Sequence, residues 1–466
     1  MVIGQPDFRV KDFRRQIVGV NLKVPSINGG RLQYINFDNA ASTPALRPVV
    51  EALNDFLPWY SGVHRGTGYK SLVSTGQYNR SREVVAGFVH ADCERDVVIF
   101  LKNTTEAINK LSYRLACQAG DQVLVTAMEH HSNDLPWRRQ ARVNYAGLDE
   151  AGRLDLVDLE EKLKRGYPRT RLVAVCGASN VTGHLNDIHR IATLAHEYRS
   201  RLLVDGAQLV PHQPVDMKPA TDPAHIDYLA FSGHKLYAPY GSGVLIGPRD
   251  TFAEGAPEYS GGGTIRAVHR DAVYWAEAPE KEEAGSPNVL GVLGLALTLT
   301  YLRKIGMDKL AGYEDNLTQY AWRQLKGIRG ITIYGDVHRV AVISFNLAGL
   351  PHSLLGAILC YEAGIGVRTG CFCAQPYVRY LLGESEQLVQ CAKNDGSCQE
   401  PLPGMVRISL AAYNTTAEID RLVDWLKRIS GNRREFMRRY RYDALNDEYI
   451  PRGVDVPALL ARLAGE

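Results

Sequence analysis

Apolar and polar positions follow one another along the chain in a way that predicts strands and helices in turn. Short apolar runs rich in β-branched residues occur at 97–101, 122–126, 171–176, 201–204, 227–231 and 243–246. Segments with helical periodicity lie between several of these runs, at 105–117, 156–165 and 187–200. This alternation is typical of an α/β fold, in which helices cover a mainly parallel sheet and sites form at the carboxyl ends of its strands.

The pattern changes near residue 307 and predicts a smaller α+β domain. The expected elements there are a helix at 307–327, strands near 331–334 and 341–347, a helix at 352–363, a strand at 405–410 and a helix at 416–429. The predicted division is an N-terminal segment (1–35) that packs with the small domain, a large cofactor-binding domain (36–306), the small domain (307–432) and a C-terminal extension (433–466). The polar, turn-rich stretch 383–404 is interpreted as an insertion loop of the small domain.

Composition and charge narrow the class of protein. A hydrophobic content of 45%, a charged content of 23% and a net charge of +3 are typical of a soluble globular protein, and they favour neither a nucleic acid nor a membrane as partner. The apolar run 289–302 is shorter than the roughly 20 residues needed to cross a bilayer, so it predicts a buried helix. No signal peptide is evident, and eight cysteines in 466 residues do not make a disulfide framework. We therefore expect a cytoplasmic protein with reduced thiols.

Three groups at predicted strand ends point to pyridoxal phosphate. Lys235 follows Ser-Gly-His at the end of one apolar strand, where a lysine with a lowered pKa can form a Schiff base. Asp205 ends another strand and can keep a pyridine nitrogen protonated. Thr104 and Thr105 open a helix after a strand, where free N–H groups and hydroxyls can bind a phosphate. Each feature alone has an ordinary structural explanation, but their order favours the cofactor.

These features belong to a series of motifs that resembles the class V aminotransferase-fold enzymes, and most closely the cysteine desulfurases of the sulfur-mobilising type. The motifs are DNAASTP (38–44), HRGTGY (64–69), NTTEAIN (103–109), MEHHSNDLPW (128–137), SNVTG (179–183), DGAQ (205–208), SGHK (232–235), AGSPN (284–288), VRTGCFCA (367–374) and RISLAAYNT (407–415). The resemblance implies aminotransferase fold type I and pyridoxal 5'-phosphate as cofactor. It also implies conversion of L-cysteine to L-alanine, with the sulfur held as a protein persulfide.

The resemblance implies roles for individual residues around the cofactor. Lys235 would bind it covalently and then move the substrate's α-proton, while Asp205 and Gln208 would bind the ring nitrogen and the phenolic oxygen. His130 would stack on the ring and assist proton transfer. The residues implied for the phosphate are Thr104, Thr105, Ser232, His234 and, from a neighbouring subunit, Ser286. A homodimer with shared active sites follows from that last assignment.

The resemblance also assigns the substrate site and the nucleophile. The residues implied for the amino acid substrate are Asn39, His64, Asn180, Arg368 and Arg407. Arg407 would bind the α-carboxylate with both arms of its guanidinium. Counting five residues from Arg368 gives Cys373 as the persulfide carrier.

The cysteines near Cys373 leave several alternatives open. Cys371 could be a packing residue, a resolving thiol or a metal ligand, and the insertion adds Cys391 and Cys398. The spacing of these four cysteines is not that of a usual zinc site, so no metal is predicted. The RTGCFC loop is also similar to the aminotransferase-like domain of molybdenum-cofactor sulfurases.

Two other functions compete with the desulfurase hypothesis. One is a C–S lyase, epimerase or hydrolase that uses the same cofactor and forms no persulfide. The other is a catalytically silent cofactor-binding scaffold of a sulfur-transfer complex. The sequence does not identify the sulfur-accepting protein, and it leaves selenocysteine open as a second substrate.

Overall fold

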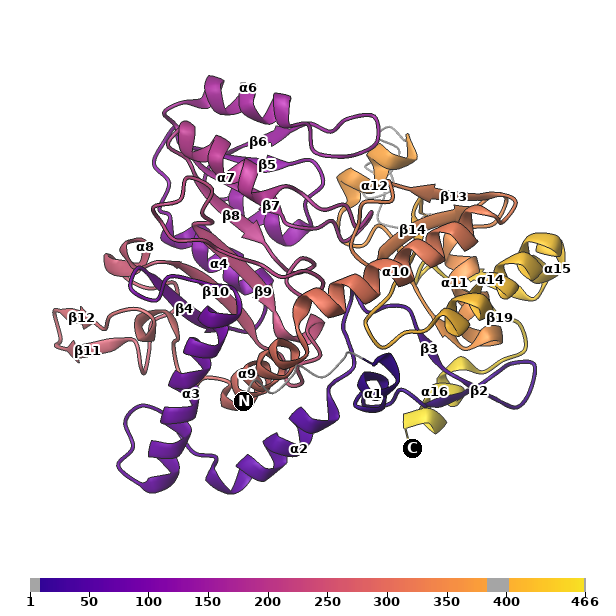
Figure 1. Ribbon diagram of the computed structural model, residues 1–466, viewed down its shortest axis with the longest axis horizontal. Coiled ribbons are helices and arrows are strands. Elements are labelled where there is room, and N and C mark those ends of the chain that lie inside the picture. Colours follow the sequence, from indigo (N-terminus) through magenta and orange to yellow (C-terminus); the bar gives the residue numbers. More distant parts are fainter. Residues whose placement is uncertain (1–8, 384–401, 465–466) are drawn as a thin grey trace, which may run out of the picture.

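A seven-stranded sheet forms the centre of the larger part of the molecule (Figure 1). This computed structural model describes residues 9–383 and 402–464. The strands lie in the order β4, β10, β9, β8, β7, β5, β6. Their bounds are β4 (Asp96–Leu101), β5 (Gln122–Thr126), β6 (Arg142–Ala146), β7 (Thr170–Cys176), β8 (Arg201–Asp205), β9 (Tyr228–Ser232) and β10 (Gly243–Pro248). All except β6 occupy predicted apolar runs.

The direction of these strands places several carboxyl ends at one edge of the sheet. Strands β6, β5, β7, β8 and β9 pair in parallel. Strand β10 is antiparallel to both β9 and β4, so β4 points the same way as β9. The prediction of a mainly parallel α/β sheet is confirmed, and the carboxyl ends of β4, β7, β8 and β9 lie at the same edge of the sheet.

Both faces of the sheet are buried, which explains why the strands read as continuous apolar runs. In β8, Leu202 and Val204 belong to one apolar cluster and Leu203 to another, because successive side chains point to opposite faces. Helices that supply the first cluster include α2 (Arg47–Phe56), α3 (Tyr69–Phe88), α6 (Leu156–Gly166), α7 (Ile188–Glu197) and α9 (Val289–Ile305). Those that supply the second are α4 (Thr104–Arg114), α5 (Leu135–Arg138) and α8 (Arg249–Ala253).

The smaller part is an antiparallel sheet packed with helices, as the change of pattern predicted. Its strands lie in the order β13 (Ile331–Tyr334), β14 (Val342–Leu347), β17 (Met405–Ser409) and β16 (Arg368–Gly370). Its helices are α10 (Met307–Lys326), α11 (His352–Ala363), α12 (Gln375–Leu382) and α14 (Thr416–Gly431). The sheet and three of these helices, α10, α11 and α14, share a separate apolar cluster. The residue boundaries between the two parts stay a prediction.

The N-terminal segment contacts both parts of the molecule. Phe13 packs edge-on against Tyr237 of the larger part, and Arg14 pairs with Glu418 of the smaller part at 2.7 Å. At the other end, Arg439 pairs with the buried Glu362 at 2.9 Å. The terminal elements are α1 (Val10–Arg15), β1 (Lys23–Pro25), β2 (Arg31–Gln33), β3 (Ile35–Asn36), α15 (Arg433–Arg438), β18 (Tyr440–Asp443), β19 (Glu448–Pro451) and α16 (Val456–Ala464), and β3 pairs with β15 (Ile365–Gly366).

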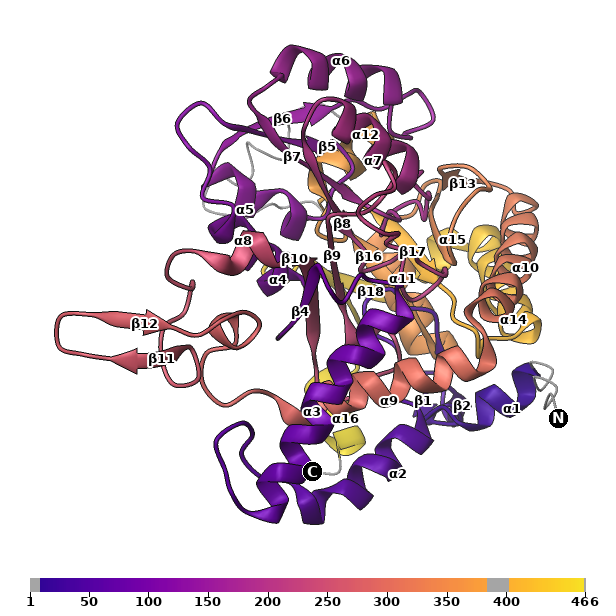
Figure 2. The same cartoon turned by 60° about the vertical axis from the view of Figure 1, so that its left-hand side comes forward.

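A hairpin of β11 (Ile265–Val268) and β12 (Val273–Trp275) projects away from the larger part (Figure 2). Across residues 9–383 and 402–464, no single helix is long and apolar enough to cross a membrane. The pair α9 and α10 reaches that length and composition together, but the two helices meet at an angle of 79°.

Candidate active site

A cavity of about 300 Å³ opens at the carboxyl ends of β7, β8 and β9. Its walls come from the sheet, from the start of α4, and from the segments 368–373 and 407 of the smaller part. The predicted site residues that line it are Thr104, Thr105, His130, Asn180, Asp205, Gln208, Ser232, His234, Lys235, Arg368, Cys373 and Arg407. The fold therefore brings together side chains that lie far apart in the sequence.

Lys235 ends a short 3-10 helix, η3 (Gly233–Lys235), that directly follows β9. Burial, with a contribution from the neighbouring Arg407, lowers the pKa of this lysine to about 8, although Asp205 and Cys373 act in the opposite direction. A substantial fraction of the amine is therefore uncharged near neutral pH. An uncharged amine is what nucleophilic addition to an aldehyde requires.

Asp205 and Gln208 lie on the floor of the cavity. Asp205 ends β8, is buried, and accepts a hydrogen bond from the Ala207 N–H at 2.9 Å. Gln208 donates its amide to the Ala40 carbonyl at 2.7 Å, and its Oε1 is buried without a partner in the described part of the chain. A buried carboxylate and an unpartnered amide oxygen beside a cavity fit a bound polar ring.

The start of α4 forms an anion site at the edge of the cavity. Asn103 caps the helix by accepting from the Glu106 N–H, which leaves the first turn open toward the cavity. Thr104 donates its N–H to Ser232 Oγ at 2.8 Å, and the two hydroxyls lie 2.6 Å apart. Thr105 is similarly linked to the hydroxyl of Ser132 at 2.7 Å. Several hydroxyls and the positive end of a helix thus gather where a phosphate would bind.

Arg407 lies in the wall opposite the sheet and is buried with an exposed fraction of 3%. It donates to the Asn180 carbonyl at 2.9 Å and pairs with Asp38 at 3.2 Å. Its Nε is buried without a partner among the described residues, so the guanidinium keeps donor capacity for a ligand. Asp38 also pairs with the half-exposed Arg368 at 2.9 Å. One carboxylate therefore orients two arginines at the cavity.

The loop that carries Cys373 is attached to the larger part of the molecule. Phe372 and Cys373 both have a positive φ, of 50° and 54°. This left-handed backbone is uncommon for such residues and is held by two contacts. Asn180 donates to the Phe372 carbonyl at 2.6 Å, and the His131 N–H donates to the Cys373 carbonyl at 2.7 Å. The side chain of Cys373 stays exposed and lines the cavity.

His130 lines the cavity and has a neutral imidazole ring. Burial lowers its pKa to about 4, with a further contribution from Lys235. Its Nδ1 accepts from the Ser132 N–H at 3.0 Å, which leaves the proton of the ring on Nε2. The adjacent His131 holds the cysteine loop through its backbone and, through Nε2, accepts from the Gln375 N–H at 3.2 Å.

Three predicted site residues lie outside the cavity. Asn39 is buried, and its side chain contacts Ser409 and Tyr413. His64 is exposed and stacks edge-on against the Tyr78 ring at 5.6 Å. Ser286 is exposed away from the cavity, where a residue that serves a neighbouring subunit would have to be.

Sequence reasoning missed three residues of the site. Asp38 precedes the predicted Asn39, and Glu129 precedes His130. Glu129 is buried and accepts hydrogen bonds from Thr126, Asn133 and the Cys176 N–H. Cys176 ends β7 directly beside Asp205 and lines the cavity. The signal that could have found Asp38 and Glu129 is their place next to a predicted residue inside a motif, and for Cys176 it is the end of an apolar run.

The thiols outside the cavity bear on the alternatives for Cys371. Within residues 9–383 and 402–464, no two of the six cysteines are joined by a disulfide. Cys371 lies 3.3 Å from the Pro403 carbonyl. Cys391 and Cys398, whose role the sequence left open, lie outside the described residues.

Comparison with known proteins agrees with this geometry. The aminotransferase class-V family model matches residues 35–422. A cysteine desulfurase of Dickeya dadantii is 40% identical over 415 residues, covering 87% of this chain and 93% of the relative. A cysteine desulfurase of Escherichia coli K12 is 36% identical over 414 residues, covering 86% and 94%.

Solved structures give the same result. The apo cysteine desulfurase of Thermococcus onnurineus superimposes with a TM-score of 0.79 at 31% identity, covering 91% of this chain and 99% of that one. The cysteine desulfurase CsdA of Escherichia coli, in an S-sulfonic acid form, gives a TM-score of 0.76 at 31% identity, covering 91% and 98%. Since the family model spans most of the chain and the relatives match nearly their whole lengths, the chain belongs to the class V aminotransferase family and, within it, to the cysteine desulfurases.

Proposed function

We propose that the chain is a pyridoxal phosphate-dependent enzyme that converts L-cysteine to L-alanine and retains the sulfur as a persulfide on Cys373. The observation that carries this proposal is the meeting of Lys235 and Cys373 in one cavity. Lys235 comes from the large sheet and Cys373 from a loop of the smaller part, and the thiol raises the lysine pKa through space. A lysine for the cofactor and a thiol for the sulfur therefore face the same ligand.

The residues present fit the cofactor. Lys235 would hold it covalently, Asp205 would pair with its ring nitrogen, and the Gln208 amide would lie beside its phenolic oxygen. Thr104, Thr105, Ser232 and His234 would hold the phosphate, since their hydroxyls and N–H groups gather at the start of α4. When bound, pyridoxal phosphate supplies an electron sink that weakens bonds at the substrate's α-carbon.

The substrate is positioned by the wall opposite the sheet. Arg407 is oriented by Asp38 and Asn180 and would bind the α-carboxylate of cysteine. Lys235 and the neutral His130 are the groups that can take up and return protons at the α-carbon, because neither is held fully charged near neutral pH. The sulfur atom of the substrate would then point toward the loop that carries Cys373.

Sulfur transfer follows as a balanced displacement. The Cys373 thiolate attacks the substrate sulfur, so a sulfur–sulfur bond forms and the carbon–sulfur bond breaks. The electron pair of the broken bond stays with the carbon fragment, which takes up a proton and leaves as alanine. The net reaction joins one protein thiol and one cysteine to give one persulfide and one alanine.

Variants of the two loop cysteines test the proposed function. The protein, loaded with pyridoxal phosphate, would be incubated with L-cysteine and dithiothreitol while alanine and sulfide are measured. We expect Cys373→Ala to lose alanine production by at least about 100-fold. Cys371→Ala, the matched control two residues away, should keep most of it. Full alanine production by Cys373→Ala would instead favour a lyase without a persulfide.

We further propose that the enzyme is a cytoplasmic homodimer that passes sulfur to an acceptor protein. Support for the dimer comes from Ser286, which is exposed outside this chain's own cavity. Large apolar side chains are also exposed along the 3-10 helix η1 (Leu57–Trp59), along α3 and along the β11–β12 hairpin, among them Trp59, Tyr69 and Tyr274. A second copy of the chain that covers them would bring the partner's Ser286 to this phosphate site.

A further inference from the structure

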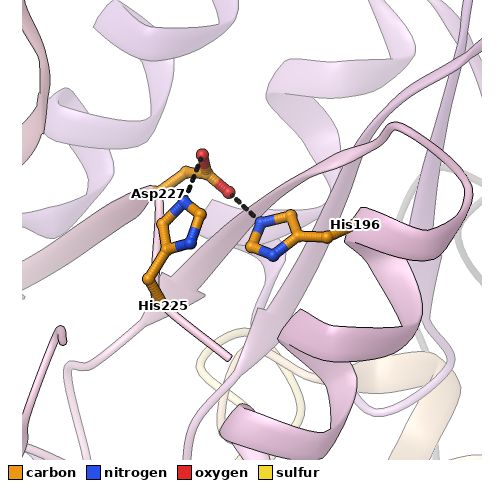
Figure 3. A group of neighbouring side chains, drawn as sticks. All are labelled: His196, His225 and Asp227. Carbon is orange, nitrogen blue, oxygen red and sulfur yellow. Dashed lines mark hydrogen bonds and ion pairs between the residues drawn. The ribbon is translucent and has the colours of Figure 1, made fainter. Parts of the chain in front are cut away.

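A cluster of two histidines and one aspartate lies at one end of the strands of the large sheet, and the active-site cavity lies at the other end. His196 lies in the last turn of α7, and His225 and Asp227 directly precede β9. The Leu202 N–H, at the start of β8, donates to Asp227 at 2.9 Å. The cluster is thus located at the amino ends of β8 and β9, whereas the cavity is at their carboxyl ends. Figure 3 shows both imidazole rings pointing at the same carboxylate.

The hydrogen bonds of the outer ring nitrogens fix the tautomers. His196 Nδ1 lies 2.7 Å from the Pro223 carbonyl, and His225 Nδ1 lies 2.7 Å from the Asp222 carbonyl. A carbonyl oxygen only accepts hydrogen bonds, so each Nδ1 carries a proton. A neutral ring of this tautomer has its lone pair on Nε2. This is the arrangement in which a backbone carbonyl orients a histidine that binds a metal.

The inner ring nitrogens face an acceptor. His196 Nε2 lies 2.8 Å from Asp227 Oδ2, and His225 Nε2 lies 3.3 Å from Oδ1. The two rings stack with their centroids 4.2 Å apart. Lone pairs that face a carboxylate repel it unless a proton or a metal ion lies between them. Arg95 also contacts this carboxylate, at 3.3 Å.

We propose that His196, His225 and Asp227 bind one divalent transition-metal ion, of which Zn²⁺ is the representative. The ligands are Nε2 of each histidine and a carboxylate oxygen, and these atoms lie within 4.8 Å of one another. Because the two rings stack nearly parallel, the imidazoles have to rotate before both Nε2 atoms reach the bond lengths of about 2.0–2.2 Å that zinc requires. Any proton that an Nε2 atom carries in the metal-free protein is released when the ion binds. A water molecule would complete four-coordination.

The site connects three segments of the larger part of the molecule. It ties the end of α7 to the loop before β9 and, through Asp227, to the first residues of β8. Because the cavity lies at the other end of these strands, the ion has no contact with the reacting atoms. Metal binding should therefore raise the melting temperature and leave the rate of alanine formation unchanged.

A matched pair of variants isolates the ligand. His225→Asn keeps a donor near the position of Nδ1, for the Asp222 carbonyl, and removes Nε2. The control is His189→Asn, on the same helix as His196, because His189 Nδ1 makes the same kind of bond to the Ala224 carbonyl at 2.8 Å but is not part of the cluster. The cofactor-loaded full chain would be freed of metal with a chelator and treated with iodoacetamide, which blocks the exposed thiols.

Calorimetric titration with ZnCl₂ at pH 7.5 measures the number of ions bound by each protein and their affinity. We expect one ion per chain for the wild type and for His189→Asn, with affinities within about twofold, and at least about tenfold weaker binding for His225→Asn. Zinc should raise the melting temperature of the first two proteins only. Equal binding by His225→Asn and the wild type would overturn the proposal, as would the absence of stoichiometric binding by the wild type.

Proton release provides an independent readout that needs no variant. Titration of the wild type in two buffers of different ionisation enthalpy measures how many protons each ion displaces. Release of protons on binding, with weaker affinity at pH 6 than at pH 7.5, supports imidazole ligands. An affinity that does not change between these pH values would show that the ion binds elsewhere and would overturn the proposal.

Discussion

At the scale of single residues, the buried position of Arg407 allows it to bind the carboxylate of a small acid. Burial lowers its pKa to about 10, although Asp38 acts to raise it, so the group stays charged at neutral pH. Asp38 and the Asn180 carbonyl satisfy part of its donor set, and Nε is left without a partner among the residues described. A preoriented cation with a free donor binds a carboxylate without first reorganising.

Replacing Arg407 tests this role. Arg407→Lys keeps the charge but loses the planar fork, so we expect the KM for L-cysteine to rise about 10- to 100-fold, with a smaller change in kcat. Arg368→Lys is the comparison, because Arg368 contacts the same Asp38 and its side chain is 48% exposed. Solvent screens an exposed pair, so the change in KM should be smaller. Equal KM values for Arg407→Lys and the wild type would contradict the assignment.

Lys235 gives a pH dependence with a defined direction. The folded-state pKa of about 8 is below the ordinary value for lysine, so the reactive uncharged form grows as pH rises toward 8. The rate at which the cofactor-free protein takes up pyridoxal phosphate covalently should therefore rise about tenfold per pH unit between pH 6 and 7 and level off above 8. Stopped-flow absorbance would measure this rate. A rate that is constant from pH 6 to 9 would contradict the depressed pKa.

Single residues show where sequence reasoning succeeded and where it could not. Lys235 and Asp205 could be predicted because Asp205 ends an apolar strand and Lys235 closely follows another, and strand ends meet at one edge of a parallel sheet. Asn39 and Asn180 both belong to motifs, yet only Asn180 lines the cavity. The direction of a side chain in a loop depends on contacts such as those of Asn39 with Tyr413, which no local pattern reveals.

At the scale of elements, the turn after β5 is a rigid support for the active site. It carries His130 and, through His131, holds the Cys373 carbonyl. Inside this turn Glu129 accepts from Thr126 and Asn133 and from the end of β7. Burial raises the pKa of Glu129 to about 8, so its carboxyl group is largely protonated at neutral pH.

Two substitutions of Glu129 test whether its hydrogen bonds, rather than its charge, stabilise the fold. Glu129→Ala leaves three buried donors without an acceptor and should lower the free energy of unfolding by about 3 kcal/mol. Glu129→Gln has nearly the same shape and keeps an acceptor, so it should cost less than about 1 kcal/mol. Urea unfolding at pH 7 measures both values. Equal losses for the two variants would mean that the hydrogen bonds are not the source of the effect.

Most elements could be predicted, and the exceptions have a physical reason. The buried strands of the large sheet read as continuous apolar runs because helices cover both faces. Strand β6 lies at the edge of the sheet and its sequence, RVNYA, mixes polar and apolar residues, so it carries no such signal. The two-residue strands β3 and β15 are held by pairing between distant segments, which local periodicity does not encode.

At the scale of the whole molecule, the active site is an interface between the two parts of the chain. The sheet supplies Lys235, and the smaller part supplies Arg407 and Cys373. The division into two parts followed from the change of pattern near residue 307. The N-terminal segment was expected on the smaller part, and its contacts reach both parts through Phe13 and Arg14. Tertiary contacts of this kind are decided by packing across the molecule.

The proposed dimer makes a prediction for Ser286. Ser286→Asp would place a negative charge beside the phosphate of the neighbouring subunit, so we expect at least about 100-fold weaker binding of pyridoxal phosphate while the particle stays dimeric. Ser286→Thr keeps the hydroxyl and should bind the cofactor like the wild type. Sedimentation and a cofactor titration measure the two properties. Unchanged cofactor affinity in Ser286→Asp would contradict a shared site.

The most direct test of the central proposal is to locate the transferred sulfur. The cofactor-loaded protein would react with L-cysteine in the absence of reductant, after which iodoacetamide labelling, proteolysis and mass spectrometry identify the cysteine that carries an additional sulfur atom. We predict that the peptide containing Cys373 carries this sulfur, in an amount equal to the alanine released, and that Cys371 does not. Alanine formed in that amount with no persulfide on Cys373 would contradict the proposal.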